Sequence, residues 1–599
     1  MFPGLTEHAA TLTAFEDLAE AMLARGLVNE AAGAAQTGAA VAAMNHAGAF
    51  ASPRLDRVLL AAARELGPAR PWRGRGADPR RVLHVYSHVA PVGGHTRLGT
   101  RVVECDHGRV HDLLITSPIQ ETPAPLLAAV RASGGRELPT TARRPTLLQR
   151  AAQLRRVALD YDAVILYLDP HDPLPAIALG GLARRPPVLS YDTADHTFAI
   201  GRPAIDLNLA FRPKGAQLAR DLRGLRAERV TVLPLPIPSP SGGDRAATRV
   251  ALGLQPDDVL LVTVAAAYKY EGGADAHLLD LVEPVLAARP NVHLVAAGPQ
   301  PEGRWAVGAQ RTGGRVRALG VTEGLPLVAA ADVVLESYPM GCGTLLLEAA
   351  GMQRALLGYA PDPQACELLS SGSSSGDACP RPGTPDAYRA ALLRLIDDRQ
   401  ARTAAGSTAR AATRLSHEPE LWRQELARCY ARAAELGPVR PQEISATVPP
   451  SGREGDILGG AHARSGKVIA PADVDRVLAS QRLILADAHL RAQFHHAPGG
   501  HPRPLRRYAI ALAAPAPDPE SIGVAVARMR DVATAQLAAR LVLTLAADDV
   551  ATAIPLIEAA LGSADELELD LTPADDPTVL ISPDTLPVAV PRDRLFAAV

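Results

Sequence analysis

The chain has 599 residues, of which 47% are hydrophobic and 21% are charged. A chain of this length exceeds a single core, since domains usually contain roughly 100–200 residues, and its composition is globular, not disordered. The formal net charge of −2 excludes an overall field that would attract nucleic acid or an anionic membrane.

The cysteines and the N-terminus indicate the cellular compartment. Five cysteines are scattered along the chain without a C-x-x-C pair, which argues against a disulfide framework and a structural zinc site. The first twenty residues are acidic and lack the apolar run of a signal peptide. No stretch of about 18 uninterrupted apolar residues occurs. These features predict a cytoplasmic protein without a membrane span.

The first region, residues 1–76, is predicted to be helical. Apolar side chains at Leu12, Phe15, Leu18 and Met22 recur at steps of three and four residues, as on one face of a helix. A stretch rich in Arg, Pro and Gly at residues 70–76 then interrupts the pattern and is typical of a linker.

Residues 77–240 have the texture of a parallel α/β domain. Short apolar runs alternate with helical spacers, which indicates strands buried on both faces. The predicted strands are residues 82–87, 112–116, 163–168, 187–191 and 230–233.

Residues 241–437 repeat this texture after a Pro- and Ser-rich stretch at 234–243. The predicted strands are residues 259–264, 292–298, 316–320 and 332–336. A helix is predicted from about Thr344 to Gly351, and a long helix from Pro419 to Leu436 closes the region.

The remaining chain is predicted to hold a linker and a smaller α/β domain. Residues 438–463 are rich in Pro, Gly and Ser, and residues 464–599 contain predicted strands at 508–512, 541–545 and 567–571. No cluster of reactive side chains follows these strands. We therefore expect a protein partner or self-association to involve residues 464–599 or residues 1–76.

A glycine turn after the strand at residues 332–336 is the strongest candidate site. Strand, turn and helix follow one another through Gly341, Cys342, Gly343 and Thr344. The free N–H groups and the dipole at a helix start favour an anion such as a diphosphate. Glu348 lies about one helical turn further on, where its carboxylate can accept hydrogen bonds from ribose hydroxyls.

A second candidate follows the first strand of the same region. Tyr268 and Lys269 leave the strand at residues 259–264, and in open parallel sheets ligands bind beyond the carboxyl ends of the strands. A lysine at that position can neutralise a diphosphate.

These motifs resemble those of GT-B glycosyltransferases. The Tyr268–Lys269 pair and the glycine turn are similar to the donor half of O-GlcNAc-transferase-like enzymes, where the lysine and the following helix hold the donor diphosphate. The resemblance implies two Rossmann-like domains facing across a cleft, and a nucleotide-sugar donor, with UDP as the first choice. No tightly bound cofactor is implied.

The sequence departs from both related families at defined positions. The ribose-binding aspartate of O-GlcNAc-transferase-like enzymes falls on Leu346, whereas Glu348 matches the second glutamate of the E-x7-E motif of retaining GT-B enzymes. The first glutamate of that motif falls on Met340. Its loss favours transfer with inversion and leaves the stereochemistry open.

Polar residues after strands of the first α/β region are candidates for the catalytic base. Gly93 and Gly94 form a turn that in GT-B enzymes faces the donor phosphates, and His95 follows them. Asp195 and His196 follow the strand at residues 187–191, and a third cluster occupies residues 169–172. A histidine pKa near 6.5 suits a general base, and the sequence leaves the choice open.

Several alternatives remain at this stage. The His and Asp spacings match no compact metal motif, and GT-B transferases generally use no catalytic metal, so no metal is expected. The acceptor is open among a protein, a peptide and a small molecule. A nucleotide-sugar 2-epimerase and a non-catalytic GT-B-like partner subunit are the other two hypotheses.

Overall fold

The structure is a computed structural model that divides into two compact units, Met1–Thr13 with Ala35–Val468, and Ala14–Ala34 with Ile469–Val599. It describes residues 2–74, 77–90, 94–118, 120–139, 146–237, 243–271, 276–369, 378–444, 447–464, 468–495, 506–511, 539–545, 568–573 and 585–587.

The first α/β domain is built on a six-stranded parallel sheet. Its strands are nearly all buried, as expected for continuous apolar runs covered on both faces. The sheet order is β2-β1-β3-β4-β5-β6. The strands are β1 Arg81–Tyr86, β2 Val110–Ile115, β3 Ala163–Tyr167, β4 Val188–Asp192, β5 Leu207–Ala210 and β6 Val230–Val232. The helices are α4 Gly94–Cys105, α5 Ala124–Ala132, α6 Leu147–Ala158, α7 Leu174–Leu179 and α8 Pro213–Asp221.

The second α/β domain is built on a five-stranded parallel sheet of order β11-β10-β7-β8-β9. The strands are β7 Val259–Val264, β8 Val292–Ala297, β9 Val316–Ala318, β10 Val333–Leu335 and β11 Ala355–Leu357. The helices are α9 Arg245–Ala251, α10 Leu278–Ala288, α11 Gly303–Arg311, α12 Gly324–Ala330, α13 Gly343–Gly351, α14 Pro363–Leu369, α15 Pro385–Asp397 and α16 Arg399–His417.

Each sheet has one strand more than the sequence predicts. Strand β5 has four residues with Asn208 in the middle, and β11 has three residues. Neither run contains a β-branched residue, so both lack the β-propensity that marks the equally short β6, β9 and β10. Parallel pairing with a neighbouring strand holds each of them in its sheet: β5 pairs with β4, and β11 pairs with β10.

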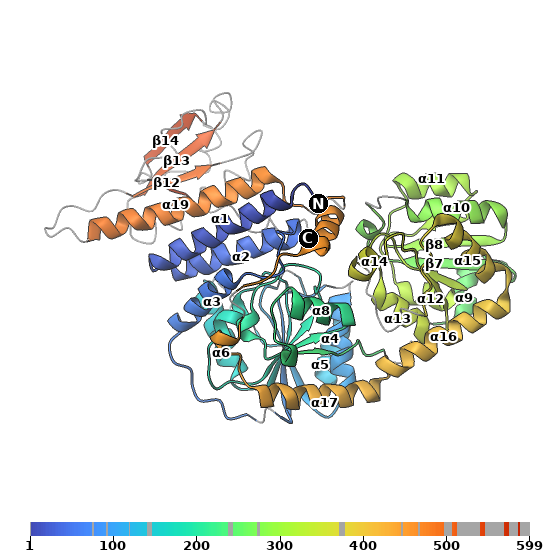
Figure 1. Cartoon of the computed structure of the whole chain (residues 1–599), viewed down its shortest axis with the longest axis horizontal. Coiled ribbons are helices and arrows are strands. Elements are labelled where there is room, and N and C mark those ends of the chain that lie inside the picture. The colour runs from blue at the N-terminus through green and yellow to red at the C-terminus, as the bar shows by residue number, and fades with distance from the viewer. Residues whose placement is uncertain are drawn as a thin grey trace. The chain divides into compact units, whose positions relative to one another are not determined.

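The last long helix, α17 Pro419–Leu436, has the predicted bounds but packs on the first domain. Trp422, Leu426 and Tyr430 belong to the core cluster of the first sheet, and Trp422 Nε1 donates to Pro234 O at 2.7 Å. In Figure 1, α16 leads from the second domain into α17 along the first. Two parallel α/β domains with such a returning helix form the GT-B architecture, which confirms the predicted fold.

Helices cover the N-terminal region, and a helix also occupies the expected linker. The N-terminal helices are α1 Leu5–Ala24, α2 Val28–Asn45 and α3 Pro53–Glu65. Ser52 caps α3, its side chain accepting from Leu55 N at 3.1 Å. Within residues 438–463, expected to be a linker, the chain instead forms most of α18 Gly452–Arg464. Leu458 of α18 is buried against Phe50, Leu218 and Leu368, so this stretch is part of the packed structure.

The second unit contains α19 Pro471–His495 and a four-stranded parallel sheet of order β14-β13-β12-β15. The strands are β12 Arg506–Ala511, β13 Ala539–Leu545, β14 Glu568–Pro573 and β15 Thr585–Pro587. Three of them match the predicted strands. The three-residue β15 was not predicted, since it ends in Pro587, a residue that argues against a strand.

A buried histidine pair lies inside the first sheet. His84 Nε2 is 2.9 Å from His111 Nδ1, and His111 Nε2 is 2.9 Å from the carbonyl oxygen of Asp106. Because the carbonyl only accepts, His111 Nε2 carries the proton, its Nδ1 accepts, and His84 Nε2 donates. Both rings are therefore neutral, and burial lowers the pKa of each, with the neighbouring ring lowering that of His84 further.

We expect this pair to make the protein unstable in acid. Below pH about 6.5 these histidines bind protons in the unfolded chain but stay neutral in the folded protein. Each ring therefore lowers the free energy of unfolding by up to about 1.4 kcal/mol per pH unit as the pH falls. Calorimetric melting at pH 7.5 and 5.5 measures this slope. His84→Gln is expected to reduce it and the exposed His107→Gln to leave it unchanged, whereas equal slopes in all three proteins would contradict the interpretation.

Candidate active site

The predicted site residues of the second domain, and His95 of the first, follow strands at the topological switch points of the two sheets, whereas Asp195 and His196 follow β4. In the first sheet the strand order reverses between β1 and β3, and in the second between β7 and β10. Ligands of open parallel sheets bind in the crevice beyond the carboxyl ends of such strands. The loops after β7 and β10 carry Lys269 and the glycine turn, and the loop after β1 leads to His95.

Lys269 and the glycine turn are brought into contact. Lys269 sits in the 3₁₀ turn Ala267–Tyr270, beside the half-buried Tyr268. Its Nζ donates to the carbonyl oxygen of Gly341 at 2.7 Å. Burial lowers the pKa of Lys269, although Cys342 and Glu336 raise it in part. Among the described residues no carboxylate lies within ion-pair distance of this ammonium, which leaves room for an anionic partner.

The glycine turn opens α13 as predicted. Cys342 is the N-cap residue and its side chain makes no capping hydrogen bond. The first N–H groups of a helix, here from Gly343 and Thr344 onward, have no acceptor within the helix. Cys342 is buried, and burial raises the pKa of its thiol, with Glu336 adding to the effect. The thiol is therefore neutral, and the turn presents amides and no negative charge.

The first domain contributes a second helix start at the same place. A Cβ added to Gly94, the first residue of α4, would lie 3.3 Å from Thr344 Oγ1. This contact is tight, so a side chain at position 94 would require Thr344 to shift by a few tenths of an ångström. Gly93, also expected here, lies outside the described residues. The positive ends of α4 and α13 thus lie side by side, an arrangement that an anion stabilises.

Glu348, expected to hold the ribose, is engaged elsewhere. Its side chain is fully buried, and Arg97 Nη1 lies 3.1 and 3.2 Å from its two carboxylate oxygens. Arg101 forms a second ion pair with the same carboxylate. Both arginines belong to α4, so Glu348 joins the two domains.

His95 lies at the start of α4, next to Gly94, in an environment that is unfavourable for a catalytic base. Its ring lies 5.3 Å from that of Tyr86 and 6.0 Å from that of His88. Nε2 is buried without a hydrogen-bond partner. Burial lowers the pKa of His95 to about 4, with the nearby Asp169 opposing the effect, which makes it a weak base at neutral pH.

Asp195 and His196 are in contact, but the aspartate is committed to another cation. Arg212 Nε and Nη2 donate to Asp195 at 2.5 and 2.7 Å, and His196 Nδ1 is 3.2 Å from Asp195 Oδ1. Burial alone would raise the pKa of Asp195, but Arg212 outweighs it and lowers the pKa well below the usual range. Arg212 also donates to the carbonyl oxygens of Glu367 and Leu368 in α14. Asp195 is fully buried and serves this contact between domains.

The structure adds His88, which the sequence did not single out, and pairs it with Asp169 of the third predicted cluster. His88 follows β1 and Asp169 follows β3, and His88 Nδ1 lies 2.8 Å from Asp169 Oδ2. Hydrogen bonding to Asp169 raises the pKa of His88, while burial opposes it. With Nδ1 directed at the carboxylate, Nε2 is the nitrogen able to take a proton. Both side chains are about a quarter exposed.

Neighbouring side chains hold this pair in place. Ser87 Oγ donates to Asp172 Oδ2 at 2.7 Å and accepts from Asp169 N at 2.8 Å. Thr116 Oγ1 also donates to Asp172 Oδ2, at 2.9 Å. The sequence signal that could have identified His88 was its position, because Ser87 and His88 directly follow the first strand at the switch point.

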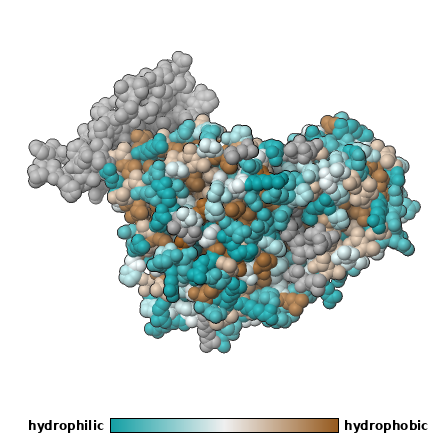
Figure 2. Space-filling model, in the orientation of Figure 1, coloured by the Kyte–Doolittle hydropathy of each residue, from teal (hydrophilic) through white to brown (hydrophobic). Residues whose placement is uncertain are grey.

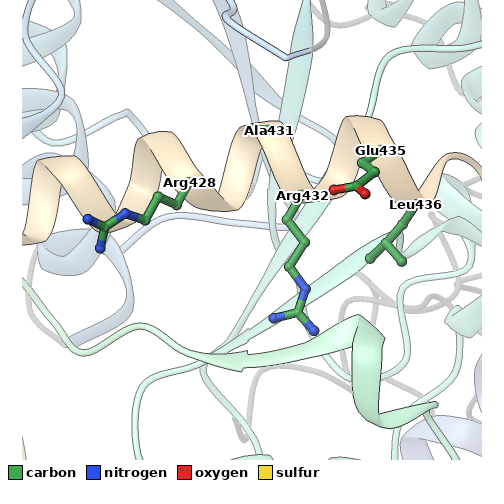
Figure 3. A pocket seen from close by; sticks show the side chains of 5 residues that line it. All are labelled: Arg428, Ala431, Arg432, Glu435 and Leu436. Atoms are coloured by element: carbon green, nitrogen blue, oxygen red, sulfur yellow. The ribbon is translucent and has the colours of Figure 1, made fainter.

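Other surface features lie away from these loops. An open hollow of about 670 Å³ lies beside α17, lined by Arg428, Ala431, Arg432, Glu435 and Leu436 (Figure 3). On the face shown in Figure 2, hydrophilic residues of the described part of the chain lie between smaller hydrophobic areas. In the described part of the chain, no three His, Cys, Asp or Glu residues are grouped to hold a metal. None of the helices described has the length and apolar character needed to cross a bilayer.

The fold and the site define a class. Two parallel α/β domains of GT-B type, with a lysine and a glycine turn at the switch point of the second sheet, give the chain a nucleotide-sugar-glycosyltransferase-like fold.

Comparisons with known proteins give distant similarities. No protein-family model and no curated protein sequence matches the chain. Among solved structures it is similar to Anabaena HepE in complex with UDP and glucose, with TM-score 0.45 and 15% identity over 58% of this chain and 98% of that one. It is also similar to a mutant O-GlcNAc transferase of Thermobaculum terrenum, with TM-score 0.42 and 18% identity over 70% and 84%. A third is UDP-GlcNAc 2-epimerase of Neisseria meningitidis bound to UDP-GlcNAc, with TM-score 0.40 and 11% identity over 58% and 98%. Similarities at this level do not identify an activity.

Proposed function

We propose that this protein is a glycosyltransferase that moves a sugar from a nucleotide-diphosphate donor to a nucleophile of a separate acceptor. The observation that carries the proposal is Lys269, a half-buried lysine whose ammonium contacts the carbonyl of Gly341 and has no carboxylate partner among the described residues. It lies beside two adjacent helix starts, at Gly94 and Gly343. A diphosphate supplies the negative charge that all three features favour. UDP is the first choice of nucleotide, from the resemblance in sequence.

The residues of this cradle would act mainly on the leaving group. As the bond between sugar and diphosphate breaks, negative charge grows on the phosphate oxygens. Lys269 and the amides at Gly343 and Thr344 are fixed before the reaction, so they stabilise that charge without reorganising. The acceptor enters from the first domain, where the polar loops after β1 and β3 lie.

His88 is the base that the geometry favours. Its own carboxylate, Asp169, orients the ring and stabilises the protonated form, whereas His196 shares Asp195 with Arg212. His95 has a lowered pKa and a buried Nε2. In direct attack, His88 Nε2 takes the acceptor proton while the acceptor oxygen bonds to the sugar and the nucleoside diphosphate departs.

The test is a panel of UDP-, GDP- and dTDP-sugars with the full chain, measuring thermal shift and release of nucleoside diphosphate. We expect at least one donor to raise the melting temperature and to be turned over faster when a competent acceptor is added. Acceptor-independent formation of an epimeric nucleotide sugar would replace the proposal with the epimerase hypothesis. Failure of every nucleotide to bind would refute both.

The pH dependence of transfer tests the role of His88. Because Asp169 raises the pKa of His88 above 6.5, we expect kcat/KM to fall as the pH drops through that raised value. His88→Gln is expected to lower the rate by about 10²-fold or more and to flatten this limb. The same limb in His88→Gln and its loss in His196→Gln would assign the base to His196.

A further inference from the structure

A cluster of Arg97, Arg101 and Glu348 links helices α4 and α13. Glu348 lies on α13 and is fully buried, and both arginines lie on α4. Arg101 is 10% exposed and Arg97 is 41% exposed. Two cations therefore surround one carboxylate at the contact between the α/β domains.

The contacts between α4 and α13 follow one order along both helices. Gly94 faces Thr344, and the arginines one and two turns further on meet Glu348, about one turn beyond Thr344. Leu347 packs in the core cluster that holds Leu98 and Val102 of α4. The helices thus run in the same direction from adjacent starts. Their positive ends repel each other, so this arrangement needs a compensating attraction.

The geometry points to Arg97, Arg101 and Glu348 as an interdomain lock that holds the starts of α4 and α13 together and so forms the diphosphate cradle before the donor arrives. Glu348 is then a positioning residue and not a ribose ligand. The inference rests on the proposed function, because it explains how the diphosphate cradle of the proposed transferase is formed before the donor binds. The buried Nη1 of Arg101 has no hydrogen-bond partner among the described residues, so the two arginines offer more donors at this contact than Glu348 satisfies.

The test needs a readout that works without nucleotide. Hydrogen exchange of the peptides covering Gly94–Cys105 and Gly343–Gly351 is measured in the ligand-free full chain for Glu348→Gln, Arg101→Met and the double variant. We expect each single variant to accelerate exchange of both helices by about tenfold or more, and the double variant to add little to either single change. Affinity for UDP is expected to fall about tenfold in parallel in both single variants.

Matched controls separate the lock from a general loss of charge. Arg311→Met and Glu425→Gln remove exposed members of single ion pairs and are expected to leave exchange of both helices unchanged. If Arg101→Met fails to fold, Arg101→Lys keeps a cation without the guanidinium geometry and is expected to show a smaller increase of the same kind.

Two outcomes would overturn the lock. In the first, Glu348→Gln leaves exchange unchanged while affinities for UDP and uridine both fall, which is the behaviour of a ribose ligand. In the second, the single effects are fully additive in the double variant, so the residues do not act together. If the wild-type protein binds no nucleotide, the proposed function fails, and the exchange data still decide the lock.

Discussion

Replacing Lys269 with alanine is expected to lower kcat/KM for the nucleotide-sugar donor by about 10²- to 10³-fold. The ammonium lies against the Gly341 carbonyl within the cradle and has no other charged partner among the described residues. Its loss removes the side-chain cation that contacts the turn in the described part of the chain, so that under the proposed function the departing diphosphate is left mainly with backbone amides. Steady-state assays with a saturating acceptor measure the effect, and UDP affinity is expected to fall roughly 10- to 100-fold.

Arg304→Ala is the control for this change. Arg304 lies on α11 of the same domain and is 61% exposed, so its removal alters the domain charge equally without touching the cradle. We expect wild-type kinetics from it. Equal losses in the two variants, or an unchanged UDP affinity in Lys269→Ala, would show that Lys269 does not bind the donor.

Asp195→Asn is expected to destabilise the first unit by about 3–5 kcal/mol, because it leaves the buried Arg212 without its counter-charge. Arg212 is 2% exposed and donates to both Asp195 and the α14 backbone. Calorimetry in the absence of ligand measures the change. A purely catalytic Asp195 would instead give a stable protein with low activity.

Asp169→Asn is the matched comparison, since Asp169 is also a carboxylate after a strand of the same sheet but is 27% exposed. We expect a small change in melting temperature and a clear change in the pH profile, because His88 loses the group that raises its pKa. A loss of stability as large as that of Asp195→Asn would contradict the different roles assigned to the two aspartates.

The sequence predicted the fold through its long buried strands. Runs such as β1 and β7 are buried at five of their six residues and follow the expected pattern for parallel sheets. The short strands β5 and β11 were missed because they contain no β-branched residue, whereas β6, β9 and β10 are equally short but contain valines. Helix α18 was taken for a linker because residues 438–463 are rich in Pro, Gly and Ser, whereas its packing depends on Leu458 meeting residues distant in the chain.

The sequence predicted those parts of the site whose residues are close together in the chain. Strand, glycine turn and helix are adjacent in sequence, so Gly341–Thr344 and Lys269 could be proposed together, and they are in contact. Partners distant in sequence could not be read in this way. Arg97 and Arg101 lie about 250 residues from Glu348, and Asp169 lies 81 residues from His88. Such pairs depend on which strands become neighbours, and they determine which carboxylates and histidines are available for chemistry.

The central claim is that the cradle binds a nucleoside diphosphate through its phosphates. Isothermal titration of the full chain with UDP, UMP and uridine tests this most directly. The account predicts that UDP binds best, that each lost phosphate weakens binding by about tenfold or more, and that Lys269→Ala removes most of the difference between UDP and UMP. Equal binding of UDP and uridine, or a UDP preference that Lys269→Ala leaves intact, would contradict it.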